Sequence, residues 1–526
     1  MDFHYAISFV LEAHLPFVRE FQKDDDLSQA GEESRFFEYV SETLLPFLEM
    51  LHHLETDHVP FRFGLAISPV LIHLLTDDHL QRKYLSYIDK QIEFGRQEIE
   101  RTANNDELNK LAQRYYNTIV DRRIAYTERY ERNLLKAFDF FRRKGKLEIL
   151  ASCATHAFLP FISHNSESLQ AQMEIPIAAY RRYFAGAPQG FWLPELGWSS
   201  ALEPYLRDYN FSYTVVDSHG LLFGNPQPKK GTFYPVKTHS GTCVLARDLY
   251  AVREIEKITK DDIFRNNDRD VGYEMPPETV KAFLSSEGER HRTGYKYWQR
   301  TGGNYNPQAA TGKASEYAKI FLQNTINRLE EASKHMDETP LVLYANNAGF
   351  FGNLWHEGFQ FLETLFRLAH EYKDLKFINP GEYIFKQEFS KIPIVSPEFS
   401  SGGINGYAET WLDVSNDWIY PHLARSMERM TELAERFPDD TGLKERALNQ
   451  AAREILLAQS SDWAALLFKQ DSTEYAANQA ENALRNFTTI YEALGSNYIS
   501  TEWLTTLERR HNIFPHINYR VFRRKK

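Results

Sequence analysis

The chain has 526 residues, of which 42% are hydrophobic and 25% are charged, and its formal net charge is −11. This length and balance are typical of a globular protein with two or three domains and a large core. The acidic charge argues against a nucleic-acid partner, which needs a basic surface, and no uninterrupted apolar stretch is long enough to span a membrane.

Two features bear on the cellular compartment. The only two cysteines, Cys153 and Cys243, lie in apolar strand-like segments, which predicts free thiols in a reducing environment rather than a disulfide framework. The N-terminal segment lacks the basic start of a signal peptide. We therefore expect a cytoplasmic protein, while its oligomeric state stays unknown from the sequence.

The first part of the chain alternates between strand and helix patterns. Residues 5–11 read as a buried strand, the leucine stripe within 44–54 as a helix, and residues 63–68 as a second strand that ends before Pro69. From about 77 to 145 the pattern is helical and highly charged. A block of this kind between two strands predicts a helical insertion on the side of a sheet or barrel.

Strand patterns then return at regular intervals, and polar residues follow them. The expected strands cover residues 147–153, 190–193, 213–216, 243–246, 340–344 and 375–378. Strands that alternate with helices predict a parallel sheet, and sites in such folds lie at the carboxyl ends of the strands.

The last part of the chain is predicted to be helical. Gly402-Gly-Ile-Asn-Gly406 has the composition of a boundary loop. Beyond it, Leu423, Met427, Met430, Leu433 and Phe437 form one apolar stripe, and Arg453–Leu467 reads as a continuous second helix. We therefore expect one domain over residues 1–400, which includes the insertion, and a helical C-terminal domain over 401–526.

Five polar side chains stand at the ends of predicted strands. Three are histidines, His14, His156 and His219, and two are carboxylates, Glu195 and Asp217. Histidine in such a place can donate hydrogen bonds to a sugar hydroxyl or bind a metal. Each alone is more often a satisfied structural residue, but together they predict a polar cluster at one edge of the sheet.

The motifs around these residues resemble glycoside hydrolase family 57, in particular its alpha-1,4-glucan branching enzymes and the similar proteins labelled alpha-amylases. The resemblance covers nearly the whole chain and rests on eight segments in the family order. These are Ala13-His-Leu-Pro16, Ala154-Thr-His-Ala-Phe-Leu-Pro160, Gly190-Phe-Trp-Leu-Pro-Glu195, Val216-Asp-Ser-His-Gly220, Lys296-Tyr-Trp298, Glu409-Thr-Trp411, Asn416-Asp-Trp418 and Gln459-Ser-Ser-Asp-Trp463.

The resemblance implies an α/β fold, namely an incomplete seven-stranded (β/α) barrel with a helical insertion and a C-terminal helical domain. It also implies a retaining double displacement on an alpha-1,4-glucan or maltooligosaccharide, without a metal or organic cofactor. Glu195 matches the family nucleophile. The positions that match residues of the glucan cleft are His14, His156, Trp298, Trp411, Trp418, Asp462 and Trp463.

One family position carries the wrong chemistry for catalysis. The run Asn346-Asn-Ala-Gly-Phe-Phe-Gly-Asn-Leu-Trp-His-Glu-Gly358 places Asn347 where the family has its acid/base aspartate, and Gly349 where it has a nearby glutamate. An amide has no proton to donate at neutral pH, and loss of general acid/base help costs about 10²–10⁴-fold in rate. Glu357 is the nearest carboxylate in sequence, but it matches a separate family position.

A second departure supports an impaired enzyme. The branching-enzyme loop of Gly-Tyr-Pro-Gly-Asp-Pro type is absent after Arg247-Asp248. We therefore expect a family 57 protein with reduced or lost catalysis. One alternative is a non-enzymatic glucan-binding or partner protein in polysaccharide metabolism. The other is a metal-dependent enzyme of the deacetylase or mannosidase kind, with His14, His156, Asp217 and His219 as ligands.

Overall fold

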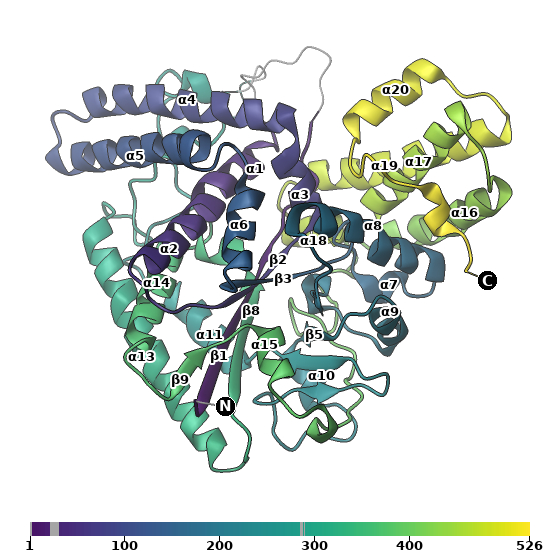
Figure 1. Ribbon diagram of the computed structural model, residues 1–526. Coiled ribbons are helices and arrows are strands. Elements are labelled where there is room, and N and C mark those ends of the chain that lie inside the picture. The colour runs from purple at the N-terminus through teal and green to yellow at the C-terminus, as the bar shows by residue number, and fades with distance from the viewer. Residues whose placement is uncertain (1–2, 21–30, 285–287, 289, 526) are drawn as a thin grey trace.

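A parallel sheet that curls into an open barrel lies at the centre of the protein, as the computed structural model shows (Figure 1). The structure describes residues 3–20, 31–284, 288 and 290–525. One sheet has the order β3-β2-β1-β8, with β9 also paired to β1, and the other has the order β4-β5-β7-β6. The strands are β1 Tyr5–Ala13, β2 Phe63–Ile67, β3 Leu147–Leu150, β4 Gly190–Phe191, β5 Tyr213–Val216, β6 Val236–Lys237, β7 Cys243–Ala246, β8 Leu341–Asn347 and β9 Leu375–Phe377.

Two contacts join these sheets into an incomplete seven-stranded barrel. A parallel bridge between Ala151 and Phe191 links β3 to β4. At the opposite seam the Asp248 N–H donates to the Leu343 carbonyl at 2.6 Å, next to β7 and β8. Seven of the described strands, β1 to β5, β7 and β8, therefore run parallel around one interior, as the sequence predicted.

The strands are apolar on both faces because helices cover the outside and side chains fill the inside. Alternate residues of β1 and β8, such as Val10, Leu343 and Ala345, pack with Trp192 and Leu245 in an interior cluster. The other face packs against the surrounding helices. The barrel is thus a filled core, and it can present functional groups only at its ends.

The charged helical block of residues 77–145 is a helical insertion, as predicted. Asp77 begins it by accepting hydrogen bonds from the backbone N–H groups of His79 and Leu80, which caps the first long helix. The two long helices lie side by side beyond the barrel (Figure 1). The elements are α4 Asp78–Arg101, α5 Asp106–Ile124, η2 Ala125–Arg129 and α6 Leu134–Arg143.

The remaining helices of the first 400 residues surround the barrel. Two of them, α13 Pro307–Ser333 and α14 Gly358–Ala369, flank β8 in the sequence and pack together. The others are α1 Ser34–Tyr39, η1 Val40–Leu44, α2 Leu45–Thr56, α3 Pro69–Thr76, α7 Leu159–Ile162, α8 Ser166–Phe184, η3 Pro194–Leu196, η4 Ser200–Leu202, α9 Glu203–Asp208, α10 Ser218–Leu222, α11 Leu249–Ile258, α12 Val271–Glu274, η5 Lys281–Phe283, η6 Ala348–Phe351, α15 Pro380–Phe385 and η7 Phe389–Lys391.

The C-terminal region is helical and lies beside the barrel, with the chain end at its outer surface (Figure 1). Its elements are α16 Ile419–Arg436, α17 Gly442–Ala458, α18 Ser461–Lys469, α19 Thr473–Gly495, α20 Thr501–Arg510 and η8 Tyr519–Phe522. The prediction of one continuous helix over Arg453–Leu467 is wrong. Ser460 adopts an extended backbone and caps a new helix, so the chain turns between α17 and α18.

Two further expectations meet the structure here. Cys153 and Cys243 are both free and buried, as predicted. None of the described helices carries an apolar stretch long enough to cross a membrane.

Candidate functional site

Glu195 follows β4 in a strained conformation. Its φ and ψ are 58° and 20°, and Leu196 also has a positive φ of 53°. Left-handed geometry at a non-glycine residue costs about 1–3 kcal/mol and often marks a functional position. The Glu195 side chain is 29% exposed, and burial of its surroundings raises the pKa of the carboxyl to about 7 although His156 opposes that rise. The Glu195 carboxyl is therefore only partly ionised near neutral pH, and its recorded ion pair with His156 is long, at 4.0 Å.

His156 connects Glu195 to a second buried acid. Its Nε2 lies 2.9 Å from Glu12 Oε1, and its Nδ1 lies 3.0 Å from Ser461 Oγ and 4.0 Å from Glu195 Oε1. Ser461 gives its own proton to the His156 carbonyl at 2.7 Å, so its oxygen can accept from Nδ1. Both ring nitrogens are then donors. Burial opposes the charge, but Glu12 raises the pKa of His156 to about 9.

His14 stacks flat on His156 and has its own acid. The ring centroids are 3.7 Å apart with an interplanar angle of 4°. His14 Nδ1 meets Ser68 Oγ at 2.8 Å, and Nε2 meets both oxygens of Asp462 at 3.0 Å. Burial disfavours the Asp462 charge, but His14 overcomes that penalty and lowers the pKa of Asp462 to about 2. The break before α18 is what brings Asp462 to this place.

The four residues of the alternative metal set, namely His14, His156, Asp217 and His219, do not form one cluster of ligands. Candidate ligand atoms of His14, His156 and Asp462 lie within 4.8 Å of one another. Asp217, however, pairs with Arg247, and His219 Nε2 bonds the Gly406 carbonyl at 2.7 Å. The polar groups around the stacked histidines instead form two hydrogen-bonded acid–imidazole pairs.

Asn347 ends β8 rather than standing in a loop. The sequence predicted a strand that stops at 344, but pairing with β1 continues to Asn347, whose register partner is Glu12. Its Oδ1 accepts the Gly349 N–H at 2.8 Å and so caps η6. The residue is half-buried and keeps an ordinary extended backbone, with φ −67° and ψ 139°. Asparagine here is a relaxed structural cap without acid/base chemistry.

The space beside Gly349 is filled by neighbours. A Cβ added at Gly349 would lie 2.7 Å from Asn353 Oδ1 and 3.0 Å from both Asn347 Oδ1 and Tyr39 Cε2. Asn353 Oδ1 in turn accepts from the Thr43 hydroxyl at 3.0 Å. A side chain at position 349 would therefore crowd these neighbours.

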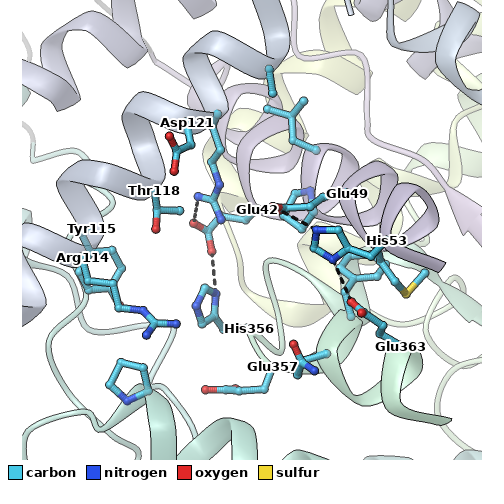
Figure 2. Close-up of a pocket in the computed structure, with 18 of the residues that line it drawn as sticks. Glu42, Glu49, His53, Arg114, Tyr115, Thr118, Asp121, His356, Glu357 and Glu363 are labelled. Atoms are coloured by element: carbon cyan, nitrogen blue, oxygen red, sulfur yellow. Dashed lines mark hydrogen bonds and ion pairs between the residues drawn. The ribbon is translucent and has the colours of Figure 1, made fainter. Parts of the chain in front are cut away.

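The end of the same loop is held by a buried ionic network (Figure 2). Glu42 pairs with Arg265, Arg122 and His356. Burial opposes its charge, but the two guanidinium groups and the His356 hydrogen bond hold its pKa well below the usual range. Glu357 accepts from the Tyr305 hydroxyl at 2.6 Å and from the Arg265 N–H at 3.2 Å. A cavity of about 950 Å³ between α2, α5 and α14 is lined by Glu42, Arg122, Tyr305, His356 and Glu357. Glu357 is thus committed to this network.

The tryptophans matched to the glucan cleft occupy different environments. Trp411 and Trp463 are each 2% exposed and pack in one cluster with Phe158, on which Trp411 stacks at 5.0 Å. Trp418 and Trp298 are half-buried, and Trp298 lies under Arg269 at 4.4 Å. Their part in glucan binding stays a prediction.

Three residues of the site were missed by sequence reasoning. Glu12 sits in β1 and would have been found only by extending that strand from 11 to 13. Ser461 is one residue before the recognised Asp462 and orients His156. Tyr39 belongs to the unremarkable helix α1, so no local signal pointed to it.

Comparisons with known families and curated proteins cover almost the whole chain. Residues 8–395 match the family described as Glycosyl hydrolase family 57, and residues 422–522 match the 1,4-alpha-glucan branching enzyme C-terminal family. A curated 1,4-alpha-glucan branching enzyme of Thermococcus kodakarensis is 24% identical, over 97% of this chain and 77% of that protein.

Solved structures agree with this assignment. The alpha-amylase AmyC of Thermotoga maritima is 32% identical, with a TM-score of 0.91 over 99% of this chain and 100% of that chain. A branching enzyme from Pyrococcus horikoshii shares the fold, with a TM-score of 0.88 and 24% identity over 100% of this chain and 98% of that one. The barrel with its helical C-terminal region is therefore an established architecture.

Proposed function

The chain belongs to glycoside hydrolase family 57, and on that premise we propose that it acts on alpha-1,4-glucans by retaining transfer or hydrolysis, slowly. Glu195 is the nucleophile of this proposal. Asn347 occupies the acid/base position, and its amide cannot protonate a departing sugar. The result is an enzyme of branching-enzyme or amylase type whose turnover of natural glucan is impaired.

The observation that carries the proposal is the state of Glu195. It is a half-exposed carboxylate on a strained backbone, next to the Nδ1 of a charged imidazole at 4.0 Å. A retaining glycosidase needs such a group to attack the anomeric carbon and form a covalent intermediate. Strain of this kind persists only where the surrounding structure enforces it.

Asn347 supports the second half of the proposal. Its side-chain oxygen is used in a helix cap, and its nitrogen carries no transferable proton near neutral pH. Poor leaving groups need that proton, whereas a leaving group such as fluoride does not. The expected loss on natural glucan is about 10²–10⁴-fold.

The test is a reaction with α-maltosyl fluoride, followed by mass spectrometry of the peptides. We expect a glycosyl adduct on Glu195, absent from Glu195→Gln, together with slow formation of new reducing ends or alpha-1,6 branches from amylose. The ratio of those two products distinguishes hydrolysis from branching. Tight binding of maltooligosaccharide without any adduct would contradict the proposal and favour a glucan-binding protein.

A further inference from the structure

Glu12 lies beside the position that has lost its acid. It is the register partner of Asn347 across the parallel β1–β8 pair, so the two side chains leave neighbouring strands on the same face, about 4.8 Å apart. Val10, Leu343 and Ala345, one step earlier on these strands, fill the barrel interior. Glu12 and Asn347 therefore both project from the layer of the barrel next to Glu195.

Glu12 and Glu195 face the same imidazole from opposite sides. Glu12 Oε1 is 2.9 Å from Nε2 of His156, and Glu195 Oε1 is 4.0 Å from Nδ1. The two carboxylate oxygens, Glu12 Oε1 and Glu195 Oε1, can therefore lie no farther apart than the sum of these two distances and the width of the ring. Retaining glycosidases hold their two carboxyl groups about 5–5.5 Å apart, and this upper bound allows that separation.

From these contacts we propose that Glu12 supplies the acid/base carboxyl that position 347 lacks, an inference that rests on the proposed function. A glutamate is one methylene longer than an aspartate, so from the neighbouring strand its carboxyl can reach toward the space in front of Asn347. Glu12 is only 5% exposed, and among the described residues its recorded hydrogen-bond partner is His156.

The proton for this step is stored in the pair formed by Glu12 and His156. Both nitrogens of His156 act as donors, one to Glu12 and one to Ser461, which makes the ring an imidazolium. As Glu195 forms its bond to the anomeric carbon, the bond from that carbon to the leaving oxygen breaks. The Nε2 proton passes through Glu12 to that oxygen, and the ring becomes neutral.

The second step runs in reverse through the same groups. A water molecule or a glucan hydroxyl attacks the anomeric carbon and breaks its bond to Glu195. Glu12 removes the proton of the attacking hydroxyl and His156 takes it up, so the starting state returns.

The experiment compares Glu12→Gln with the native chain on two donors. Glutamine keeps an oxygen that can accept from His156, so the fold should survive. We expect amylose turnover to fall by about 10²-fold or more, while adduct formation from α-maltosyl fluoride changes little, since fluoride needs no proton. Glu148→Gln is the matched control: Glu148 is a hydrogen-bonded glutamate at the start of β3, bonded to Tyr213, and its substitution should leave both reactions unchanged.

A double variant separates a catalytic from a structural role. Adding Asn347→Asp to Glu12→Gln should restore amylose turnover, because a carboxyl group returns on the adjacent strand. If Glu12 had only a structural role, Asn347→Asp would not restore turnover. Unchanged amylose turnover in Glu12→Gln would overturn the inference, as would a native protein that forms the adduct but never cleaves amylose. A native protein that forms no adduct would instead refute the proposed function.

Discussion

The loop after β4 and the end of β8 face the same site, but they are built differently. Glu195 and Leu196 hold positive φ angles, and the Glu195 carboxyl has an elevated pKa, with the His156 ring as its ion-pair partner at 4.0 Å. Asn347 has a relaxed backbone and spends its side chain on a cap. The backbone is strained at the proposed nucleophile and relaxed at the position proposed to lack its acid.

The side chains that surround Glu195 and those that surround Asn347 differ in the same way. Around Glu195, His156 itself has a positive φ of 56° and is fixed by Glu12, Ser461 and the stacked His14. Around Asn347, the gap at Gly349 is closed by Tyr39 and Asn353. Charged and polar groups surround the proposed nucleophile Glu195, whereas the neighbours of Asn347 fill the space beside it.

The largest expected effect is at the nucleophile. Glu195→Gln removes the attacking carboxylate, and loss of a nucleophile costs on the order of 10⁴–10⁶ in rate. Adduct formation with α-maltosyl fluoride should vanish, as followed by intact mass. If Glu195→Gln still formed an adduct at the same rate, the contrast between the two regions would have no catalytic meaning.

The second largest effect is expected at low pH, where protonation of Glu195 should stop its attack. Only the ionised carboxylate attacks, and burial raises the pKa of Glu195 to about 7, so the adduct rate should fall tenfold per pH unit below 7, to about 100-fold at pH 5. The groups that face it are His156, Glu12, Asp462 and Lys469. A rate that is flat from pH 5 to pH 8 would show that the carboxyl ionises normally.

Removal of the charge under the stacked histidines should cost stability. Asp462 has a pKa lowered to about 2 in the folded chain, so its charge stabilises the fold above the unfolded pKa, and this contribution is lost as pH falls through 2. Asp462→Asn should therefore lower the free energy of unfolding by about 2 kcal/mol at pH 7. Urea titration measures it, and Asp268→Asn, at an exposed aspartate, gives the baseline.

The smallest effect is expected from a substitution in the loop at Gly349. Gly349→Glu restores a family carboxyl, but its Cβ would press on Asn353, Asn347 and Tyr39. Overpacking of this kind costs about 1–3 kcal/mol, and we expect a lower melting temperature with no gain in amylose turnover. A gain in amylose turnover without a lower melting temperature would mean that the loop has room for a glutamate at position 349.

Much of this molecule could be predicted from local sequence. Apolar runs located the main strands, because parallel strands are buried on both faces and read as unbroken hydrophobic segments. The charged block of residues 77–145 predicted the helical insertion from composition and spacing alone. The roles of Glu195 and Asn347 come from the family resemblance and stay predictions.

The remainder depended on contacts between distant segments. Glu12 looks like an ordinary charged residue at the end of a strand until the β1–β8 register sets it beside Asn347. The turn at Ser460 was read as helix because a serine can lie within one, and only its bonding across to the His156 loop shows why the chain breaks there. Neither contact has a local signature.

The most direct test of the central claim compares Asn347→Asp with the native chain on amylose and on α-maltosyl fluoride. Aspartate caps a helix as well as asparagine, so the substitution returns the acid without disturbing the loop. The account predicts that amylose turnover rises about tenfold or more while the adduct rate from fluoride stays the same. Equal changes on both donors, or no change on amylose, would contradict the claim that proton transfer limits the turnover of amylose at this site.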